Sequence, residues 1–198
     1  MCHKLACMIT DFLLCKNTIK KEDAEIYQYG YDLLIYTVLQ ILLLCILGTL
    51  FGQKLSTIVY IVVFVSLRQY VGGYHASTRL GCTMVTVISY LVVMGLIIIE
   101  NTWYESLFFW VLAIAFCAWV IIRYAPVENG NKPLSGRQVK QNRKSGCMLF
   151  IMYMVIALLV RLLSRRISNS IIFTVMAVAV LMIIQKKKGG KTHDEASC

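Results

Sequence analysis

Charged residues are scarce in this chain. Only 15% of its 198 residues are Asp, Glu, Lys or Arg, whereas 59% are apolar and the mean hydropathy is +0.70. A soluble domain usually has about half apolar residues, so this composition predicts a protein that meets lipid. No apolar core of suitable length near the N-terminus is followed by a small-residue cleavage site. We therefore expect no secretory signal peptide, and apolar segments that stay as membrane spans.

Acidic residues are scarcer still, with ten Asp and Glu against twenty Lys and Arg. In a soluble chain this excess would suggest nucleic acid, but here the basic residues lie between and beyond the apolar runs. Such placement is typical of membrane topology and argues against a nucleic-acid partner. The eight cysteines form no CxxC pair, and Cys45 and Cys117 lie inside apolar runs. We expect reduced thiols, with at most one of them reactive.

The apolar runs predict an all-α integral membrane protein with six transmembrane helices. The first run is long enough to cross a hydrocarbon core of roughly 30 Å, whereas the second is short and is expected to end in the headgroup zone. Residues 1–17 place apolar side chains on one helical stripe, which predicts an amphipathic interfacial helix. Packing of this helix on the protein's own cytoplasmic face is an equal alternative. The expected organisation is one membrane domain, 1–198, with an interfacial helix and connector at 1–25, spans at about 33–50, 55–68, 82–99, 107–122, 147–163 and 171–184, and a cytoplasmic tail at 185–198.

Six spans would place both termini on one side of the membrane. Of the twenty Lys and Arg, only Lys54, Arg161, Arg165 and Arg166 would then lie on the other side. By the positive-inside rule, the termini and the long basic connector face the cytoplasm. We therefore expect a multi-pass protein of the cell membrane, with the loop between the second and third spans at the cytoplasmic side.

A polar, glycine-bearing stretch, residues 66–83, interrupts the apolar runs. It holds His75, the only histidine away from the chain ends, and Cys82 seven positions later. A cysteine thiolate is a strong nucleophile and a neighbouring imidazole can take its proton, so a Cys–His dyad is the sharpest hypothesis. On one helix the two side chains would be about 10 Å apart along the axis. A dyad therefore requires a break between them, which Gly81 could provide.

The same stretch offers groups that could assist such a nucleophile. If the third span starts at Cys82, its thiol lies at a helix N-terminus, which favours the thiolate. Gly72 and Gly73 could aim backbone N–H groups at a developing oxyanion, and Arg68 could hold a substrate carboxylate or carbonyl. Plainer interpretations stay open, since the glycines could form a simple loop and Arg68 and Arg79 could anchor span ends.

Metal binding and a second nucleophile are weaker hypotheses. No further His, Cys or acidic residue of the stretch completes a ligand set with His75 and Cys82, and the pair Cys2 and His3 is a weak signal. We therefore expect no metal or cofactor. Cys147 lies at a span entrance among basic residues, but no histidine lies near it in sequence. No carboxylate of the stretch presents itself as the third member of a triad.

Two motifs together resemble a known family. The first is Arg68-x-x-x-Gly72-Gly73-x-His75-Ala76 followed by Cys82, and the second is Tyr124-Ala125-Pro126 with Lys132-Pro133 after the fourth predicted span. The pattern resembles the accessory gene regulator protein B (AgrB) family, a bacterial class of membrane-embedded cysteine endopeptidases that mature a small quorum-sensing propeptide. The chain length, the N-terminal amphipathic segment and the basic connector are similar as well.

The resemblance implies roles for residues at matching positions. It implies that Cys82 is the nucleophile and His75 its base, with Arg68, Gly72 and Gly73 as supporting residues. It implies cleavage of an AgrD-like propeptide through a thioester acyl-enzyme, followed by cyclisation to a thiolactone or lactone. It also implies a homodimer, although no GxxxG motif locates an interface. The basic connector residues that would help bind the propeptide are Lys132, Arg137 and Lys140.

The competing hypothesis is a non-enzymatic membrane transporter or exporter component, in which residues 66–83 form a cytoplasmic re-entrant loop. Such a protein would be expected to bury ionisable side chains within its spans. Apart from Arg161, near the end of one predicted span, the sequence places none there. The peptidase hypothesis is therefore favoured.

Overall fold

The computed structural model describes residues 2–16, 18–72, 79–99, 106–127 and 135–195, and these ranges are helical with short connecting turns and no strand. The all-helical fold class is thereby confirmed. The chain divides into two compact units, Met1–Leu47 and Gly48–Cys198. The expectation of a single membrane domain stays a prediction, and each unit is described by itself.

Unit 1 is a helical hairpin. Helix α1 (Cys2–Cys15) is followed by a short 3-10 turn, η1 (Lys21–Asp23), and by α2 (Ala24–Leu50), whose last residues belong to unit 2. The Gln28 side-chain amide on α2 donates to the Cys7 sulfur on α1 at 3.1 Å. On α1 the predicted apolar stripe stays largely exposed, with Met8 67% and Phe12 61% accessible. An interfacial position of α1 stays a prediction.

Helix α2 begins well before the predicted span at residue 33 and includes Asp32, whose side chain is only 3% exposed. Asp32 thus lies one residue before the predicted span, in a helix that is long and apolar enough to cross a membrane. The expectation that Arg161 is the single ionisable residue within the spans stays a prediction. The predicted span boundary, placed at the first uninterrupted apolar run, leaves this buried carboxylate out.

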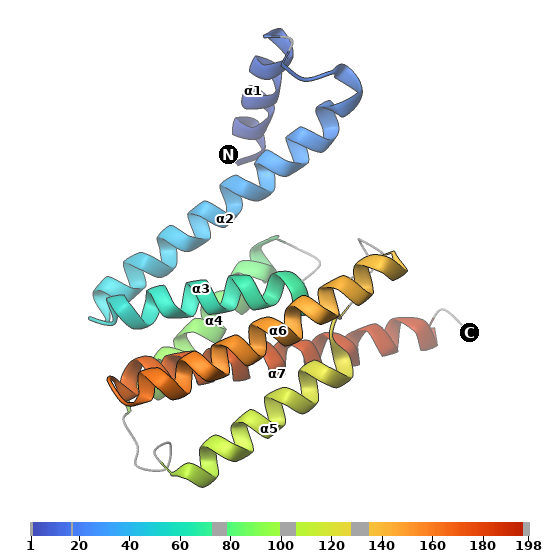
Figure 1. Ribbon diagram of the computed structural model, residues 1–198. Helices are drawn as coiled ribbons and strands as arrows, with labels where there is room; N and C mark the ends of the chain where they lie inside the picture. The colour runs from blue at the N-terminus through green and yellow to red at the C-terminus, as the bar shows by residue number, and fades with distance from the viewer. Residues whose placement is uncertain (1, 17, 73–78, 100–105, 128–134, 196–198) are drawn as a thin grey trace. The chain divides into compact units, whose positions relative to one another are not determined.

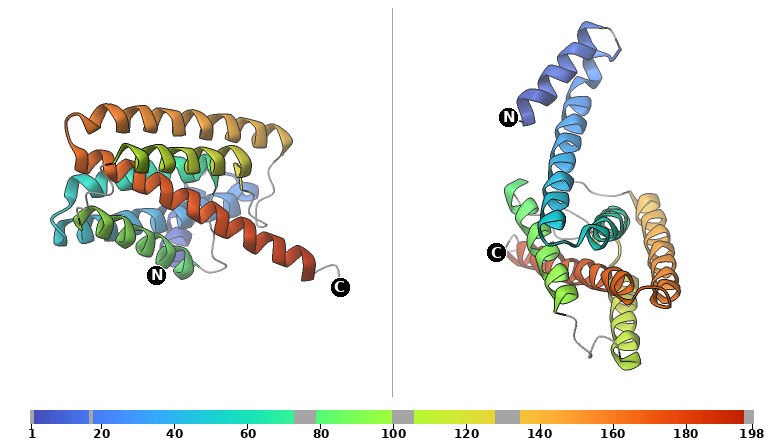
Figure 2. Two further views of the ribbon diagram at one scale, coloured as in Figure 1. Left: turned by 90° about the horizontal axis from the view of Figure 1, so that it is seen from below. Right: turned by 90° about the vertical axis from the view of Figure 1, so that its left-hand side faces the viewer.

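The described part of unit 2 is a bundle built around its last helix. Helix α7 packs against α3, α4, α5 and α6, and the right-hand view of Figure 2 shows it among these four helices. Its buried face carries Ile172, Val175, Ala179 and Met182, which are fully buried and recur at helical spacing. The five helices are α3 (Lys54–Val71), α4 (Arg79–Ile98), α5 (Leu107–Tyr124), α6 (Gly136–Arg161) and α7 (Arg165–Glu195), as shown in Figure 1.

Helix α6 runs antiparallel to α3. The Ser66 and Tyr153 hydroxyls lie 2.7 Å apart, and at the other contact Gly146 faces Val71 at the end of α3. A Cβ on Gly146 would lie 2.6 Å from Val71 Cγ1, so a larger residue here would force the Val71 side chain or the helices to shift. The end of α3 therefore lies beside the third turn of α6.

Five helices are long and apolar enough to cross a membrane, and α5 is a shorter apolar helix. Two contacts align α5 antiparallel to α6: Arg143 donates to the Ile122 carbonyl at 2.8 Å, and the Arg161 guanidinium lies 4.5 Å from the Trp110 ring centroid. The predicted six spans depend on α5 and stay a prediction. The long candidates are Lys21–Leu50, Lys54–Val71, Leu80–Ile98, Gly136–Arg161 and Arg165–Lys187.

Several helices extend beyond the predicted spans into polar sequence. Helix α6 starts at Gly136 because Ser135 and Gln138 form a capping box, in which each side chain bonds the other residue's backbone N–H. Helix α7 continues to Glu195, so most of the predicted tail is helical. Apolar runs show where a helix enters lipid, and capping shows where it begins.

Candidate active site

The end of α3 is fixed by a glycine. Gly72 has φ +78° and donates its N–H to the Arg68 carbonyl at 3.1 Å, which closes the last turn. A Cβ at Gly72 would lie 2.5 Å from the Val127 carbonyl oxygen. Both the positive φ and the close backbone therefore require glycine here. An additional role of Gly72 at an oxyanion stays a prediction.

The two sequence motifs meet at this point. The Val127 N–H donates to the Val71 carbonyl at 3.0 Å, and Val127 directly follows Tyr124-Ala125-Pro126 in the chain. Ala125 is buried, with 7% of its surface exposed. The backbone after α5 is thus held against the end of α3, the helix that carries Arg68 of the first motif.

Arg68 and Cys82 are brought together across the α3–α4 connection. The Arg68 guanidinium donates through Nη2 to the Cys82 sulfur at 3.4 Å, and through Nη1 to the Thr86 hydroxyl at 3.3 Å. Thr86 in turn donates to the Cys82 carbonyl at 3.1 Å. Arg68 and Cys82 are half-buried, and Thr86 is 3% exposed. The buried hydroxyl thus helps to hold the guanidinium at the sulfur.

Further hydroxyl groups form hydrogen bonds between α3 and α4, on the side of the Arg68–Cys82 pair that lies toward the N-terminus of α3. Tyr60, which is fully buried, donates to the Thr86 carbonyl at 3.3 Å and lies 2.6 Å from the Ser89 hydroxyl. One turn further, the Thr57 and Tyr90 hydroxyls lie 2.8 Å apart. Buried polar groups need such partners, so this interface holds α3 and α4 in one register.

Cys82 lies in the first turn of α4, which begins at Arg79. A helix break at Gly81 is wrong, because Gly81 lies within α4. The positive end of the helix dipole still lies close to the Cys82 thiol, as expected for a span that starts near this residue.

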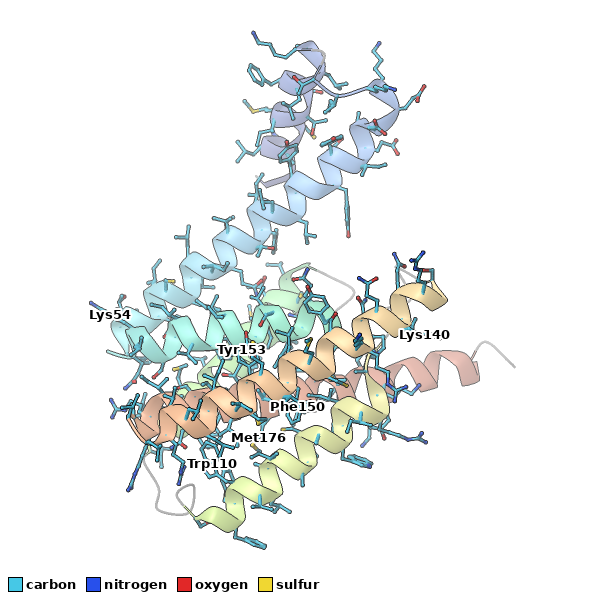
Figure 3. All side chains as sticks on the ribbon, in the orientation of Figure 1. Lys54, Trp110, Lys140, Phe150, Tyr153 and Met176 are labelled. Carbon is cyan, nitrogen blue, oxygen red and sulfur yellow. The ribbon has the colours of Figure 1, made fainter. Side chains whose placement is uncertain are left out.

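The remaining predicted site residues divide into two groups. His75, Gly73 and Lys132 lie outside the described residues. Arg137 and Lys140 lie exposed in the first turns of α6. Figure 3 shows Lys140 near that end of α6 and Lys54 at the opposite end of the bundle. The N-terminal half of α6, which carries Lys140, packs beside Val71 at the end of α3. Because Arg68 lies in the same last turn of α3, Lys140 lies at the same end of the bundle as the Arg68–Cys82 pair.

The other cysteines do not form a comparable cluster. Six cysteines whose side chains the structure describes are not in disulfides: Cys7, Cys15, Cys45, Cys82, Cys117 and Cys147. The expected reduced state stays a prediction. Within the described ranges no group of three or more His, Cys, Asp and Glu could hold a metal ion.

Thr86 and Tyr60 are site residues that sequence reasoning missed. The sequence contains a weak signal for both. Thr86 follows Cys82 by four positions on α4, and Tyr60 precedes Arg68 by eight positions on α3, so each lies on roughly the same helix face as a predicted site residue. Threonine and tyrosine are common in apolar helices, however, and neither spacing distinguishes a site residue from an ordinary packing residue.

Comparison with known proteins identifies the family. The chain matches the family model for accessory gene regulator B over residues 6–185. It is 25% identical over 188 residues to a protein described as AgrB-like from Clostridium perfringens (strain SM101 / Type A), covering 91% of this chain and 87% of that protein. It is 21% identical over 205 residues to an AgrB-like protein of Halalkalibacterium halodurans, with 100% of both covered.

A third relative is accessory gene regulator protein B of Staphylococcus intermedius, 25% identical over 114 residues, which are 58% of this chain and 59% of that protein. No solved structure matches the chain. The family match spans both motifs and every helix described above except the ends of the chain, so the resemblance seen in the motifs is confirmed. The chain belongs to the accessory gene regulator B family.

Proposed function

We propose that this protein is a membrane-embedded cysteine endopeptidase that removes the C-terminal part of an AgrD-like propeptide. Family membership implies a part in the agr quorum-sensing system of a bacterium and an AgrD-like substrate. The observation that carries the peptidase proposal is the Arg68 guanidinium held 3.4 Å from the Cys82 sulfur. A cysteine whose sulfur is paired with a fixed cation, in a helix's first turn, has the surroundings of a nucleophile.

In the proposed first step, His75 accepts the proton of the Cys82 thiol and the sulfur attacks the carbonyl carbon of the scissile peptide bond. A carbon–sulfur bond forms while the carbonyl oxygen takes the negative charge. When the carbonyl reforms, the carbon–nitrogen bond breaks and His75 returns the proton to the leaving amine. The N-terminal part of the propeptide stays on Cys82 as a thioester. Arg68 stabilises negative charge on the sulfur.

In the proposed second step, a cysteine thiol within the propeptide attacks this thioester. The new carbon–sulfur bond closes a thiolactone ring, and Cys82 leaves as a thiol, so one thioester replaces another. A serine hydroxyl would give a lactone, and water would give a linear peptide. Arg68 and Cys82 are half-buried, and exclusion of water from such a site favours ring closure over hydrolysis.

The membrane arrangement is part of the proposal. Helix α5 runs beside α6 from Trp110 to Ile122, and its 18 residues span about 27 Å as a helix. This length supports α5 as a sixth span, which would place both termini and the Cys82 site at the cytoplasmic side. There Arg137 and Lys140, both exposed, would attract an acidic part of the propeptide, together with Lys132. Homodimerisation is a further family expectation.

The test is co-expression with an AgrD-like propeptide, followed by mass spectrometry of its fragments. Cys82→Ala and His75→Ala should each abolish cleavage, while the wild-type protein should yield a peptide attached to Cys82 when the reaction is stopped with acid. Cys147→Ala is the matched control, because Cys147 is also a half-buried free thiol, and it should cleave at the wild-type rate.

Unchanged cleavage in Cys82→Ala would eliminate the peptidase proposal and return attention to a transporter or exporter component. Asp32 and Arg161 would then be the ionisable residues to examine, since both lie in helices that qualify as spans. Cleavage without ring closure would keep the endopeptidase and remove the cyclisation step.

A further inference from the structure

We propose that α5 and α6 form a binding site for the headgroup of an anionic phospholipid. A pocket of about 410 Å³ lies between these helices and is lined by Trp119, Ile122, Arg123 and Arg143. Its walls thus combine two cations with two large apolar side chains. This combination fits a ligand that carries negative charge at one end and hydrocarbon at the other.

The two guanidiniums provide the anion-binding part. Arg123 lies in the last turn of α5, and Arg143 on α6 donates through Nη2 to the Ile122 carbonyl at 2.8 Å. This bond fixes the Arg143 fork at the end of α5 and leaves its other N–H groups for a ligand. Within the described ranges neither guanidinium has a carboxylate partner. A phosphate can accept from both arginines through different oxygens.

The apolar part distinguishes a lipid from a soluble anion. Trp119 precedes Arg123 by one helical turn, and Trp119 and Ile122 are 56% and 57% exposed. Tryptophan is enriched at the membrane–water interface, where its amphipathic ring lies at the level of the headgroups. Basic pockets between transmembrane helices at the cytoplasmic side are known to hold anionic headgroups. A soluble inorganic anion would contact the arginines but would make no use of the exposed Trp119 and Ile122.

The proposed lipid site is separate from the candidate active site. The pocket is built by α5 and α6, whereas Arg68 and Cys82 lie on α3 and α4. Helix α7 lies between α4 and α5, as the right-hand view of Figure 2 shows. A lipid bound here would hold α5 to α6 without covering the Cys82 thiol.

The test is native mass spectrometry of the purified full-length protein with added phosphatidylglycerol or phosphatidylcholine of identical acyl chains. The wild-type protein should retain phosphatidylglycerol in preference. In the double variant Arg123→Gln/Arg143→Gln its retention should fall about tenfold, to the level of phosphatidylcholine. The matched control Arg137→Gln/Lys140→Gln removes two charges from exposed positions on α6 and should keep retention within about twofold of wild type.

Equal retention in the Arg123/Arg143 variant and the wild type would overturn the proposal, and so would an equal loss in the control, which would show diffuse charge attraction.

Trp119→Ala should also lower retention. If phosphatidylglycerol retention is unchanged in Trp119→Ala and millimolar inorganic phosphate displaces the lipid, the site binds a free anion and the lipid proposal is overturned. If the double variant fails to fold by circular dichroism, Arg123→Lys/Arg143→Lys replaces it, and intermediate retention is expected because lysine keeps the charge without the planar fork.

Discussion

Arg68 and Arg161 occupy matching positions at opposite ends of unit 2. Each lies half-buried in the last turn of its helix, and each lies over an aromatic ring, with centroid distances of 5.5 Å to Phe64 and 4.5 Å to Trp110. A cation near a helix C-terminus and over an aromatic ring is a common anchor of a span end. Arg68 differs because its guanidinium also donates to the Cys82 sulfur.

The comparison teaches that helix position and aromatic contact do not separate an anchor from a site residue. Both interpretations of Arg68 fit the sequence, because the anchoring features are present in Arg161 as well. The difference lies in what the second helix brings to the guanidinium. Arg68 meets a thiol and a buried hydroxyl from α4, and these contacts can be removed one at a time.

The largest difference is expected between Arg68→Gln and Arg161→Gln. Loss of the charge beside Cys82 should lower the rate of propeptide cleavage about a hundredfold, similar to the loss of one preorganised charge-stabilising donor. Arg161→Gln should stay within about threefold of wild type, because its ring contact serves packing. The measurement is the initial cleavage rate in proteoliposomes at equal protein content.

Arg68→Lys refines this comparison. Lysine keeps the positive charge but loses the fork that reaches Cys82 and Thr86 together, so an intermediate rate is expected. Equal losses for Arg68→Gln and Arg161→Gln would show that both arginines act as anchors, and the distinction drawn between them would be wrong.

A smaller effect is expected from Thr86→Val. This change removes the hydroxyl that accepts from Arg68 and should lower the cleavage rate about tenfold through a misplaced guanidinium, with KM nearly unchanged. Thr174→Val is the control, since Thr174 is also buried and its hydroxyl also bonds the carbonyl four residues before it. A merely structural role of Thr86 would lower protein yield equally in both variants and leave the rate per folded molecule unchanged.

Gly72→Ala tests what holds the end of α3 that carries Arg68. The alanine Cβ would meet the Val127 carbonyl, and a positive φ costs a residue with a side chain roughly 1–3 kcal/mol. The thermal midpoint of the detergent-solubilised protein should therefore fall by about 5 °C. Gly95→Ala on α4 is the control, because open space surrounds that position, and its midpoint should stay the same or rise slightly. A normal midpoint for Gly72→Ala would mean that the segment after α5 does not pack there.

The smallest effect is expected from Tyr90→Phe, which removes the hydroxyl bonded to Thr57. The Thr57 hydroxyl retains its bond to the Gln53 carbonyl, so the cost should be about 1 kcal/mol, or a few degrees in thermal midpoint. The cleavage rate should not change. A rate loss as large as that of Thr86→Val would show that the polar contacts around Arg68 extend the length of the α3–α4 interface.

The sequence predicted the helices well and their contacts poorly. Long apolar runs identify spans because an apolar helix satisfies its own backbone hydrogen bonds in lipid, and the motif around Arg68 and Cys82 predicted the location of the candidate site. The start of α6 at Gly136 was missed because a capping box in polar sequence, and not hydropathy, sets it. The approach of Gly72 to Val127 could not be derived, since it joins two segments whose closeness depends on the packing of α5, α6 and α7. The burial of Asp32 was not predicted either, because whether a carboxylate is buried depends on the tertiary packing around it.

The central position of α7 has a consequence for biosynthesis. Helices α3 to α6 precede α7 in the chain, yet each packs against it, so their inward faces meet lipid or the insertion machinery until α7 is made. Helices α3 and α4 can form their mutual contacts before then, but the face that each turns toward α7 is covered only afterwards. A nascent chain that stalls before residue 165 would hold every residue of the candidate active site and still lack the helix that brings the bundle together.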